Sequence, residues 1–263
     1  MRGDNWCVIL PCAGEGRRLG LDLPKELYRL DDRVRLIDLS LKHVLAGLSA
    51  TGDRILRVCV VVTPGKENVH RYVARCLPSG MTRLVYFNSR YQEWPGSVFS
   101  AHPHYEEKNL VLLPDSFLGL GGQQYWHRPD GKPLVELARR ALQRRPVFFG
   151  YREVKRKRSL RQLGALRVDG DEVVRMQDKP RQDLQEYNAC WGCYGFRRRW
   201  GRELYRLLIA SVLHQPVNYS ASSFFPAGAV ALAEYQDLGT WPAIRSFRSA
   251  RKSTLAGFSL TGS

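Results

Sequence analysis

Short apolar runs alternate with segments of helical periodicity through the first half of the chain. A continuous run of a few apolar residues rich in branched side chains is typical of a strand covered on both faces. Such runs predict strands at residues 6–10, 57–63, 83–87, 109–113 and 146–149, and apolar spacings of three and four predict helices at 66–77, 97–107 and 134–144. This strand–helix order predicts an α/β fold with a doubly wound, mostly parallel sheet.

The second half of the chain is less regular. It predicts strands at 163–168, 172–176, 191–196 and 230–234 and helices at 202–213 and 241–251. The first three of these strands would form a smaller, mixed subsheet. We expect one domain over residues 1–251, with halves at about 1–150 and 151–251. Residues 252–263 are rich in Ser, Thr and Gly and are predicted to fray.

The chain is strongly basic, with 41 Lys and Arg against 25 Asp and Glu and a formal charge of +16. Such an excess attracts polyanions, which include nucleic acid, a membrane surface and phosphorylated small molecules. The arginine excess also fits a GC-rich genome, in which case it carries no information on partners. No apolar run approaches the roughly 20 residues that span a bilayer. The N-terminus has no secretory signal, so we expect a cytoplasmic protein without a membrane partner.

Six cysteines are present, and in a cytosolic chain they are expected to be reduced. Cys190-Trp191-Gly192-Cys193 forms one CxxC motif without a second pair. A zinc site or a redox pair is possible from this spacing. Buried thiols on a strand are the simpler interpretation.

The segment that follows the first predicted strand is rich in glycine and positive charge. Gly14 and Gly16 allow backbone N–H groups to approach a phosphate chain, and Arg17, Arg18 and Lys25 can neutralise it. Open α/β sheets bind nucleotides at this end of their strands. The dinucleotide-binding fingerprint fits less well, because it needs a third glycine and a helix that starts at once.

This loop resembles the signature of the nucleotidyltransferases that make nucleotide sugars, in which GxGxR is followed by PKxL. Four further segments resemble the family's motifs in the same order, namely Gly96-Ser97, Leu112-Leu113-Pro114-Asp115, Asp178-Lys179-Pro180 and Asp237-Leu238-Gly239-Thr240. The resemblance covers residues 6–245 approximately and is strongest for thymidylyl- and uridylyltransferases acting on sugar 1-phosphates. It implies a Rossmann-like fold, and transfer of a nucleotidyl group from a nucleoside triphosphate to a phosphorylated small-molecule acceptor, with release of pyrophosphate.

The resemblance also assigns roles to individual residues. Arg18 would contact the β- and γ-phosphates, Lys25 would bridge the α-phosphate and the acceptor's phosphate, and Asp115 and Asp237 would hold Mg²⁺. The remaining nucleotide-binding candidates are Ala13, Gly14, Gly16, Arg17, Gln92, Gly96 and Ser97, and the acceptor-binding candidates are Gly164, Asp178, Lys179, Asn188 and Trp191. Without a metal role, Asp115 would be a turn residue and Asp237 a helix cap. The position of Gln92 favours a pyrimidine base.

Residues 152–161 depart from the family pattern, because they hold six cations where the family usually has an Asp-Pro pair. Such a run is usually a solvated loop, but it could instead attract an unusually anionic acceptor. Three alternatives therefore stay open. The chain could be a cytidylyltransferase acting on a phosphonate or another non-sugar phosphate, a non-catalytic nucleotide sensor, or a basic nucleic-acid-binding protein.

Nucleic acid is not the expected partner, because no helix-turn-helix, zinc-finger spacing or aromatic RNA-binding signature is present. The aspartates that follow strands would also have no role in such a protein. No repetitive β-helix extension follows the last predicted helix, so a second activity is not expected. A homo-oligomer stays open.

Overall fold

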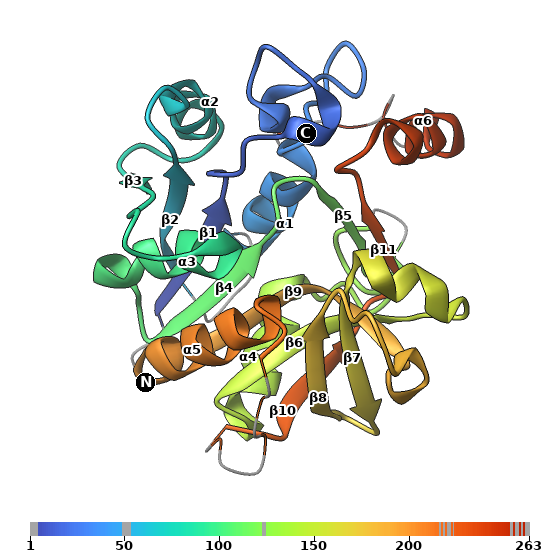
Figure 1. The fold of residues 1–263 in the computed structure, drawn as a ribbon. Helices are drawn as coiled ribbons and strands as arrows, with labels where there is room; N and C mark the ends of the chain where they lie inside the picture. The colour runs from blue at the N-terminus through green and yellow to red at the C-terminus, as the bar shows by residue number, and fades with distance from the viewer. Residues whose placement is uncertain are drawn as a thin grey trace.

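A large mixed sheet forms the centre of the molecule, with helices on both faces (Figure 1). The computed structural model describes residues 5–48, 54–122, 125–215, 217, 219, 222, 224–252, 255, 258 and 260. The strands are β1 (Asn5–Pro11), β2 (Arg54–Val62), β3 (Thr82–Tyr86), β4 (Lys108–Leu112), β5 (Ser116–Gly119), β6 (Val147–Glu153), β7 (Gly164–Asp169), β8 (Glu172–Asp178), β9 (Ala189–Arg197), β10 (Ala227–Ala231) and β11 (Glu234–Asp237).

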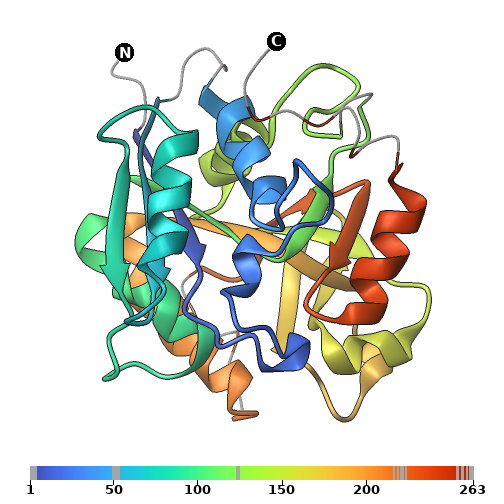
Figure 2. The same cartoon turned by 90° about the horizontal axis from the view of Figure 1, so that it is seen from above.

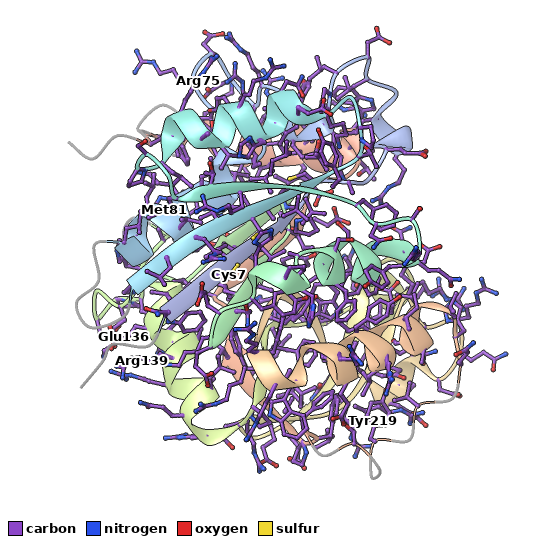
Figure 3. All side chains as sticks on the ribbon, turned by 90° about the vertical axis from the view of Figure 1, so that its left-hand side faces the viewer. Cys7, Arg75, Met81, Glu136, Arg139 and Tyr219 are labelled. Atoms are coloured by element: carbon purple, nitrogen blue, oxygen red, sulfur yellow. The ribbon has the colours of Figure 1, made fainter. Side chains whose placement is uncertain are left out.

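The helices of the described residues are α1 (Asp38–Leu48), α2 (Glu67–Cys76), α3 (Glu93–Ser100), α4 (Leu134–Arg144), α5 (Gly201–Val212) and α6 (Trp241–Ala250). Alternate side chains of β1 point to opposite faces of the sheet, as strand geometry requires. Val8 and Leu10 pack with α1, α2 and α4, whereas Cys7 and Ile9 pack with α3 and α5. In Figure 3, Cys7 lies within the sheet and Arg75 on α2 points outward.

Nine strands of the described residues form the main sheet, in the order β3-β2-β1-β4-β9-β6-β10-β8-β7. The pairs from β3 to β4 are parallel, and so is the pair of β6 with β10. However, β9 is antiparallel to both β4 and β6, and β8 is antiparallel to β7 and β10. The expectation of a mostly parallel sheet is therefore not confirmed. β9 is buried on both faces although it is antiparallel, so its continuous apolar run reports burial and not strand direction.

Two predicted elements differ from the structure in more than their terminal residues. The helix predicted at 97–107 is α3, which begins at Glu93 and ends at Ser100, before a short 3₁₀ turn at His102–His104. Pro95 fits in the first helical turn, where an N–H would have no partner, and Pro103 has no N–H with which to continue the α-helical hydrogen bonds. The strand predicted at 230–234 is divided between β10 in the main sheet and β11, which pairs with β5.

The sequence pattern also missed α1 and β5. α1 is buried on several sides, since Asp38, Ser40 and His43 are buried together with Leu39 and Leu41. A helix without a broad polar face lacks the amphipathic periodicity by which helices are recognised in sequences. β5 has only four residues, and all of them are buried.

The final segment is described only in part. Leu255 and Phe258 are buried in a cluster that includes Phe117, Trp126 and Phe247, and the rings of Trp126 and Phe258 lie 5.6 Å apart. These two residues are thus packed in a core, although they belong to the segment predicted to fray. Residues 253, 254, 256, 257, 259 and 261–263, to which the same prediction applied, lie outside the described residues.

The two cysteines of the CxxC motif lie on β9 and are free and buried, as the buried-thiol interpretation predicts. Cys190 packs with Leu160 and Tyr187, whereas Cys193 belongs to the core under α1 and α4. Because the two side chains enter different clusters, they do not form a site together. Over the described ranges, no helix is both long and apolar enough to cross a bilayer.

Candidate active site

Two predicted carboxylates meet at the edge of the sheet where β1 and β4 end. β1 and β4 are parallel neighbours, so the segments that follow them emerge on the same side. Asp115 lies just beyond β4. Asp237 ends β11, which pairs with β5 so that Asp237 lies opposite Ser116. The Leu238 amide also donates to the Asp115 carbonyl oxygen at 2.8 Å, which fixes the two aspartate segments together.

Lys25 reaches the same edge from the loop after β1. Its Nζ donates to Asp115 Oδ2 at 2.5 Å, and the two side chains are only 15% and 13% exposed. Burial lowers the pKa of the Lys25 ammonium, but the charge and hydrogen bond of Asp115 outweigh that effect and leave the pKa raised. Lys25 is therefore cationic at neutral pH and lies where it can meet an anionic ligand.

Asp237 is partly buried beside a second carboxylate. Its Oδ1 accepts a hydrogen bond from the Gly239 amide at 2.7 Å. Burial, and then the Asp115 carboxylate, raise the pKa of Asp237, and Gly239, Arg18 and Lys25 oppose them only in part. A Cβ at Gly239 would lie 2.8 Å from Arg18 Nη2 and 2.9 Å from Asp237 Oδ1. Glycine at this position thus leaves room for the Arg18 guanidinium beside the aspartate.

The glycine-rich loop packs directly on Lys25. Gly16 has φ +69°, a left-handed conformation that glycine adopts without strain. A Cβ on Gly16 would lie 3.3 to 3.4 Å from three carbons of the Lys25 side chain. An open cavity above the loop is lined by Gly14, Glu15, Gly16, Arg18, Lys25 and Gly239. Figure 2 shows this loop, in blue, between the sheet and α6 in red, and the Trp241 indole N–H donates to the Leu19 carbonyl oxygen at 3.0 Å.

A second cavity adjoins the first, and Arg18 lines both cavities. Its other lining residues are Trp94, Leu113, Asp115, Ser116, Gln162, Leu163, Gly164, Asp178, Lys179, Trp191, Tyr235 and Asp237. The structure therefore brings the predicted phosphate contacts Arg18 and Lys25, the two predicted metal ligands and four of the predicted acceptor residues into two cavities that share one arginine. These acceptor residues are Gly164, Asp178, Lys179 and Trp191.

The side chains on the far wall of this cavity are held by defined contacts. The Asp178 carboxylate is largely buried, 3.3 Å from Lys179 Nζ. The Asp178 amide and the Ser211 hydroxyl are 2.7 Å apart and form a hydrogen bond. The rings of Trp94 and Trp191 lie 5.1 Å apart and form an aromatic surface.

Other predicted residues do not line either cavity within the described part of the chain. Ala13 lies in the loop without lining a cavity, and the side chain of Arg17 lies outside the described residues. Gln92 is exposed at the start of α3. Ser97 is buried in α3, and Gly96 packs so tightly that a Cβ would lie 2.7 Å from Tyr91 Cβ. The Asn188 side chain is used by the fold, because it bonds Val168 N at 2.8 Å and Val168 O at 2.7 Å.

Sequence reasoning missed Trp94, Tyr235, Lys66 and Glu26. Trp94 lines the cavity from α3 and lies two residues before Gly96 of the predicted Gly96-Ser97 pair. Lys66 follows the end of β2, a parallel neighbour of β1, so the rule that strand ends share an edge could have indicated it. Tyr235 carried no such signal, because only the pairing of β11 with β5 brings it to the cavity.

The chemistry of the two aspartates fits a magnesium ion. Mg²⁺ prefers oxygen ligands and usually takes one or two protein carboxylates together with substrate phosphates and water. Through the described parts of the chain, no group of three or more His, Cys, Asp or Glu side chains forms a complete metal site. Asp115 and Asp237 would therefore share a bound ion with ligand phosphates.

Comparisons with known proteins bear on the fold. No family model matches the chain. A 71-residue segment, 27% of this chain, is 39% identical to the bifunctional protein GlmU of Xanthobacter autotrophicus, and it spans 14% of that protein's length.

Solved structures match over nearly the whole chain. An inositol-1-phosphate CTP transferase from T. maritima has a TM-score of 0.66 at 15% identity, with 97% of each chain covered. A putative glucose-1-phosphate thymidylyltransferase from Bacillus anthracis has a TM-score of 0.69 at 13% identity, with 98% of each covered. A UDP-glucose pyrophosphorylase complexed with UDP-glucose has a TM-score of 0.68 at 15% identity, with 95% of this chain and 99% of the other covered. The chain thus shares the fold of these sugar-phosphate nucleotidyltransferases.

Proposed function

We propose that this chain, which has the fold of the sugar-phosphate nucleotidyltransferases, is itself a nucleotidyltransferase that releases pyrophosphate. The observation that carries the proposal is the meeting of Arg18 and Lys25 with Asp115 and Asp237 around two adjoining cavities. Two cations and a carboxylate pair suit a triphosphate with Mg²⁺ on one side and a second phosphate on the other.

The reaction needs little covalent chemistry from the protein. An oxygen of the acceptor's phosphate forms a bond to the α-phosphorus of the triphosphate. The bond from that phosphorus to the bridging oxygen breaks, and pyrophosphate leaves with the electron pair. The attacking oxygen is already anionic, so no general base is required. The obstacle is repulsion between two phosphate groups, and positioned cations lower it.

Within this scheme, Arg18 binds the β- and γ-phosphates through its fork of N–H donors. Lys25 lies between the α-phosphate and the acceptor's phosphate and neutralises both. Before ligand binds, the Asp115 carboxylate holds Lys25 at 2.5 Å. When Mg²⁺ is bound, Asp115 and Asp237 would be its protein ligands, and its charge would offset that of the phosphate oxygens.

We assign the acceptor to the second cavity and take a sugar 1-phosphate as its substrate class. Asp178 can accept hydrogen bonds from acceptor hydroxyls, and Lys179 can bind the phosphate. Trp94 and Trp191 offer an aromatic surface for the apolar face of a sugar ring. The names of the similar structures support this class, because they include glucose 1-phosphate, inositol 1-phosphate and UDP-glucose. They also favour a pyrimidine triphosphate, CTP, UTP or dTTP.

The basic run does not add to the described lining of the acceptor cavity. Lys155, Arg156, Arg158 and Arg161 are exposed, and Lys157 donates to the Tyr187 carbonyl oxygen. Of this segment and the residues directly after it, the described lining includes Gln162 and Leu163, which follow the run. An ordinary neutral sugar phosphate therefore suits the site without a role for these cations.

A substrate matrix tests the proposal. ATP, GTP, CTP, UTP and dTTP are each combined with glucose 1-phosphate, inositol 1-phosphate and a phosphonate, and pyrophosphate release is measured with Mg²⁺. We expect release with at least one pyrimidine triphosphate and one sugar or polyol phosphate, and none after chelation of the metal. Release only with a phosphonate would move the acceptor to the alternative class. The absence of release in every combination would refute the proposed activity.

A further inference from the structure

Lys66, at the start of α2, uses its ammonium group to contact the glycine-rich loop and the turn that follows it. Its Nζ donates to the Cys12 carbonyl oxygen at 2.6 Å and to the Gly14 carbonyl oxygen at 2.9 Å. Nζ also lies 3.0 and 2.9 Å from the two carboxylate oxygens of Glu26. A lysine ammonium has three N–H donors, and these contacts use all of them.

Glu26 is the residue next to Lys25 and is completely buried. A buried carboxylate is costly unless it is paired, because it loses its hydration. Burial raises the pKa of Glu26, and Lys66 is the foremost group that opposes this effect. Lys66 itself is only 14% exposed, so the pair is largely closed to solvent. Neither residue lines the two cavities of the site as far as the structure describes them.

These contacts connect the two ends of the loop that carries the site. Cys12 and Gly14 lie at its start, whereas Glu26 belongs to the short 3₁₀ turn that positions Lys25. Between these points, Gly16 packs against the Lys25 side chain. Breaking the contacts would free the glycine backbone to move relative to the Lys25 ammonium.

We propose that Lys66 and Glu26 form a buried bracket, an ion pair that holds the glycine-rich loop and Lys25 in the relative positions from which they bind the phosphates of a triphosphate. Lys66 acts as a positioning residue, because it reaches the ligand only through the loop. The expected effect of the bracket on catalysis rests on the proposed function, whereas its expected effect on the stability of the loop does not. A displacement of about 1 Å in a reacting geometry can cost about a hundredfold in rate.

Two variants separate positioning from stability. Lys66→Met removes the bracket but leaves the buried Glu26 carboxylate unpaired, so we expect a lower melting temperature. Lys66→Met combined with Glu26→Met removes both charges and keeps unbranched side chains of similar length, and such apolar replacement of a buried ion pair is often neutral for stability. Lys132→Met is the matched control, because Lys132 also makes an ion pair, with Asp130, but lines neither cavity of the site.

Each protein is examined by thermal unfolding, by amide hydrogen exchange of residues 12–27, and by calorimetric titration with magnesium pyrophosphate, which requires no choice of base. For the double variant we expect a melting temperature close to that of the wild type, and exchange about tenfold faster in the loop. We also expect pyrophosphate binding to weaken by about tenfold or more and kcat to fall, with the acceptor's KM changed by less than about twofold.

The bracket is overturned if the folded double variant keeps wild-type exchange in the loop and wild-type affinity for pyrophosphate. If the double variant does not fold, Glu26→Gln replaces it, since it removes the charge and leaves Lys66 its two carbonyl partners. Unchanged exchange near residue 26 in Glu26→Gln would then overturn the bracket. A wild-type protein that binds no pyrophosphate and shows no activity would refute the proposed function, and the exchange comparison would still decide the bracket.

Discussion

Gly164 and Trp191 offer a direct test of the second cavity, which we assign to the acceptor. The Trp191 indole occupies the space that a side chain at position 164 would need. A Cβ on Gly164 would lie 1.8 Å from Trp191 Nε1 and 2.5 to 2.6 Å from two further ring atoms. Trp191 is 5% exposed and its ring packs against Trp94, so the ring has little space into which to move. Gly164→Ala therefore forces a displacement at the second cavity.

The size of the effect follows from these distances. Ordinary contact begins at 3.4 Å, so a 1.8 Å approach must open by roughly 1.6 Å before alanine fits. Overpacking of this kind costs about 1–3 kcal/mol. We expect the melting temperature to fall by several degrees, since about 1 kcal/mol corresponds to roughly 2–4 °C in a chain approaching this size. The acceptor's KM should rise and kcat should fall, because Trp191 lines the cavity.

The assay compares Gly164→Ala with Gly228→Ala in β10. At Gly228 the added Cβ would meet only ordinary contacts, at 3.4 to 3.6 Å, so little change is expected. Replacing Trp191 with Phe as well removes the ring nitrogen at the point of collision and should restore part of the stability. The reasoning is refuted if Gly164→Ala melts and turns over like Gly228→Ala. The triphosphate's KM should stay near its wild-type value in all these variants.

Three further predictions concern the charges of the site and the core. Lys25→Met should lower kcat by about 10²–10³-fold, whereas Lys132→Met should not change the rate. Because burial and Asp115 raise the pKa of Asp237, protons should compete with Mg²⁺ for this carboxylate. The rise in melting temperature that Mg²⁺ causes should be smaller at pH 5 than at pH 7.5. In Asp237→Asn this rise should be absent. His43 has its pKa lowered by burial to about 4 from 6.5. His43 is neutral in the folded state, whereas the unfolded chain binds a proton there as pH falls below 6.5. The free energy of unfolding should therefore fall by roughly 3 kcal/mol between a pH above 6.5 and pH 4. Urea unfolding of His43→Gln should not show this loss.

The local pattern of the chain was sufficient for most of the elements. The helix predicted at 134–144 has these same bounds in the structure, and the strands β1, β2 and β4 differ from their predictions by a few residues at most. A buried strand and an amphipathic helix have distinct apolar periods, and these are properties of neighbouring residues. The same is true of the turn after β1, where glycine and cations follow one another directly in the sequence.

The direction of a strand relative to its neighbours could not be predicted from local apolar patterns. An apolar run shows that a strand is covered on both faces, but β9 is covered in that way while antiparallel to β4 and β6. The division between β10 and β11 likewise depends on two different partner strands, β6 and β5, rather than on the residues at the break.

At the site, the sequence alone determined which chemistry the chain carries: a glycine-rich cationic turn after a strand, and aspartates after two others. Tertiary structure alone decided that Asp237 lies beside Asp115, because the pairing of β5 with β11 joins segments more than a hundred residues apart. It also decided that Asn188 is used by the Val168 backbone and that Lys66 holds the loop. Periodicity reports which face of an element is buried, whereas side-chain contacts depend on which elements become neighbours, and that depends on the packing of the whole sheet.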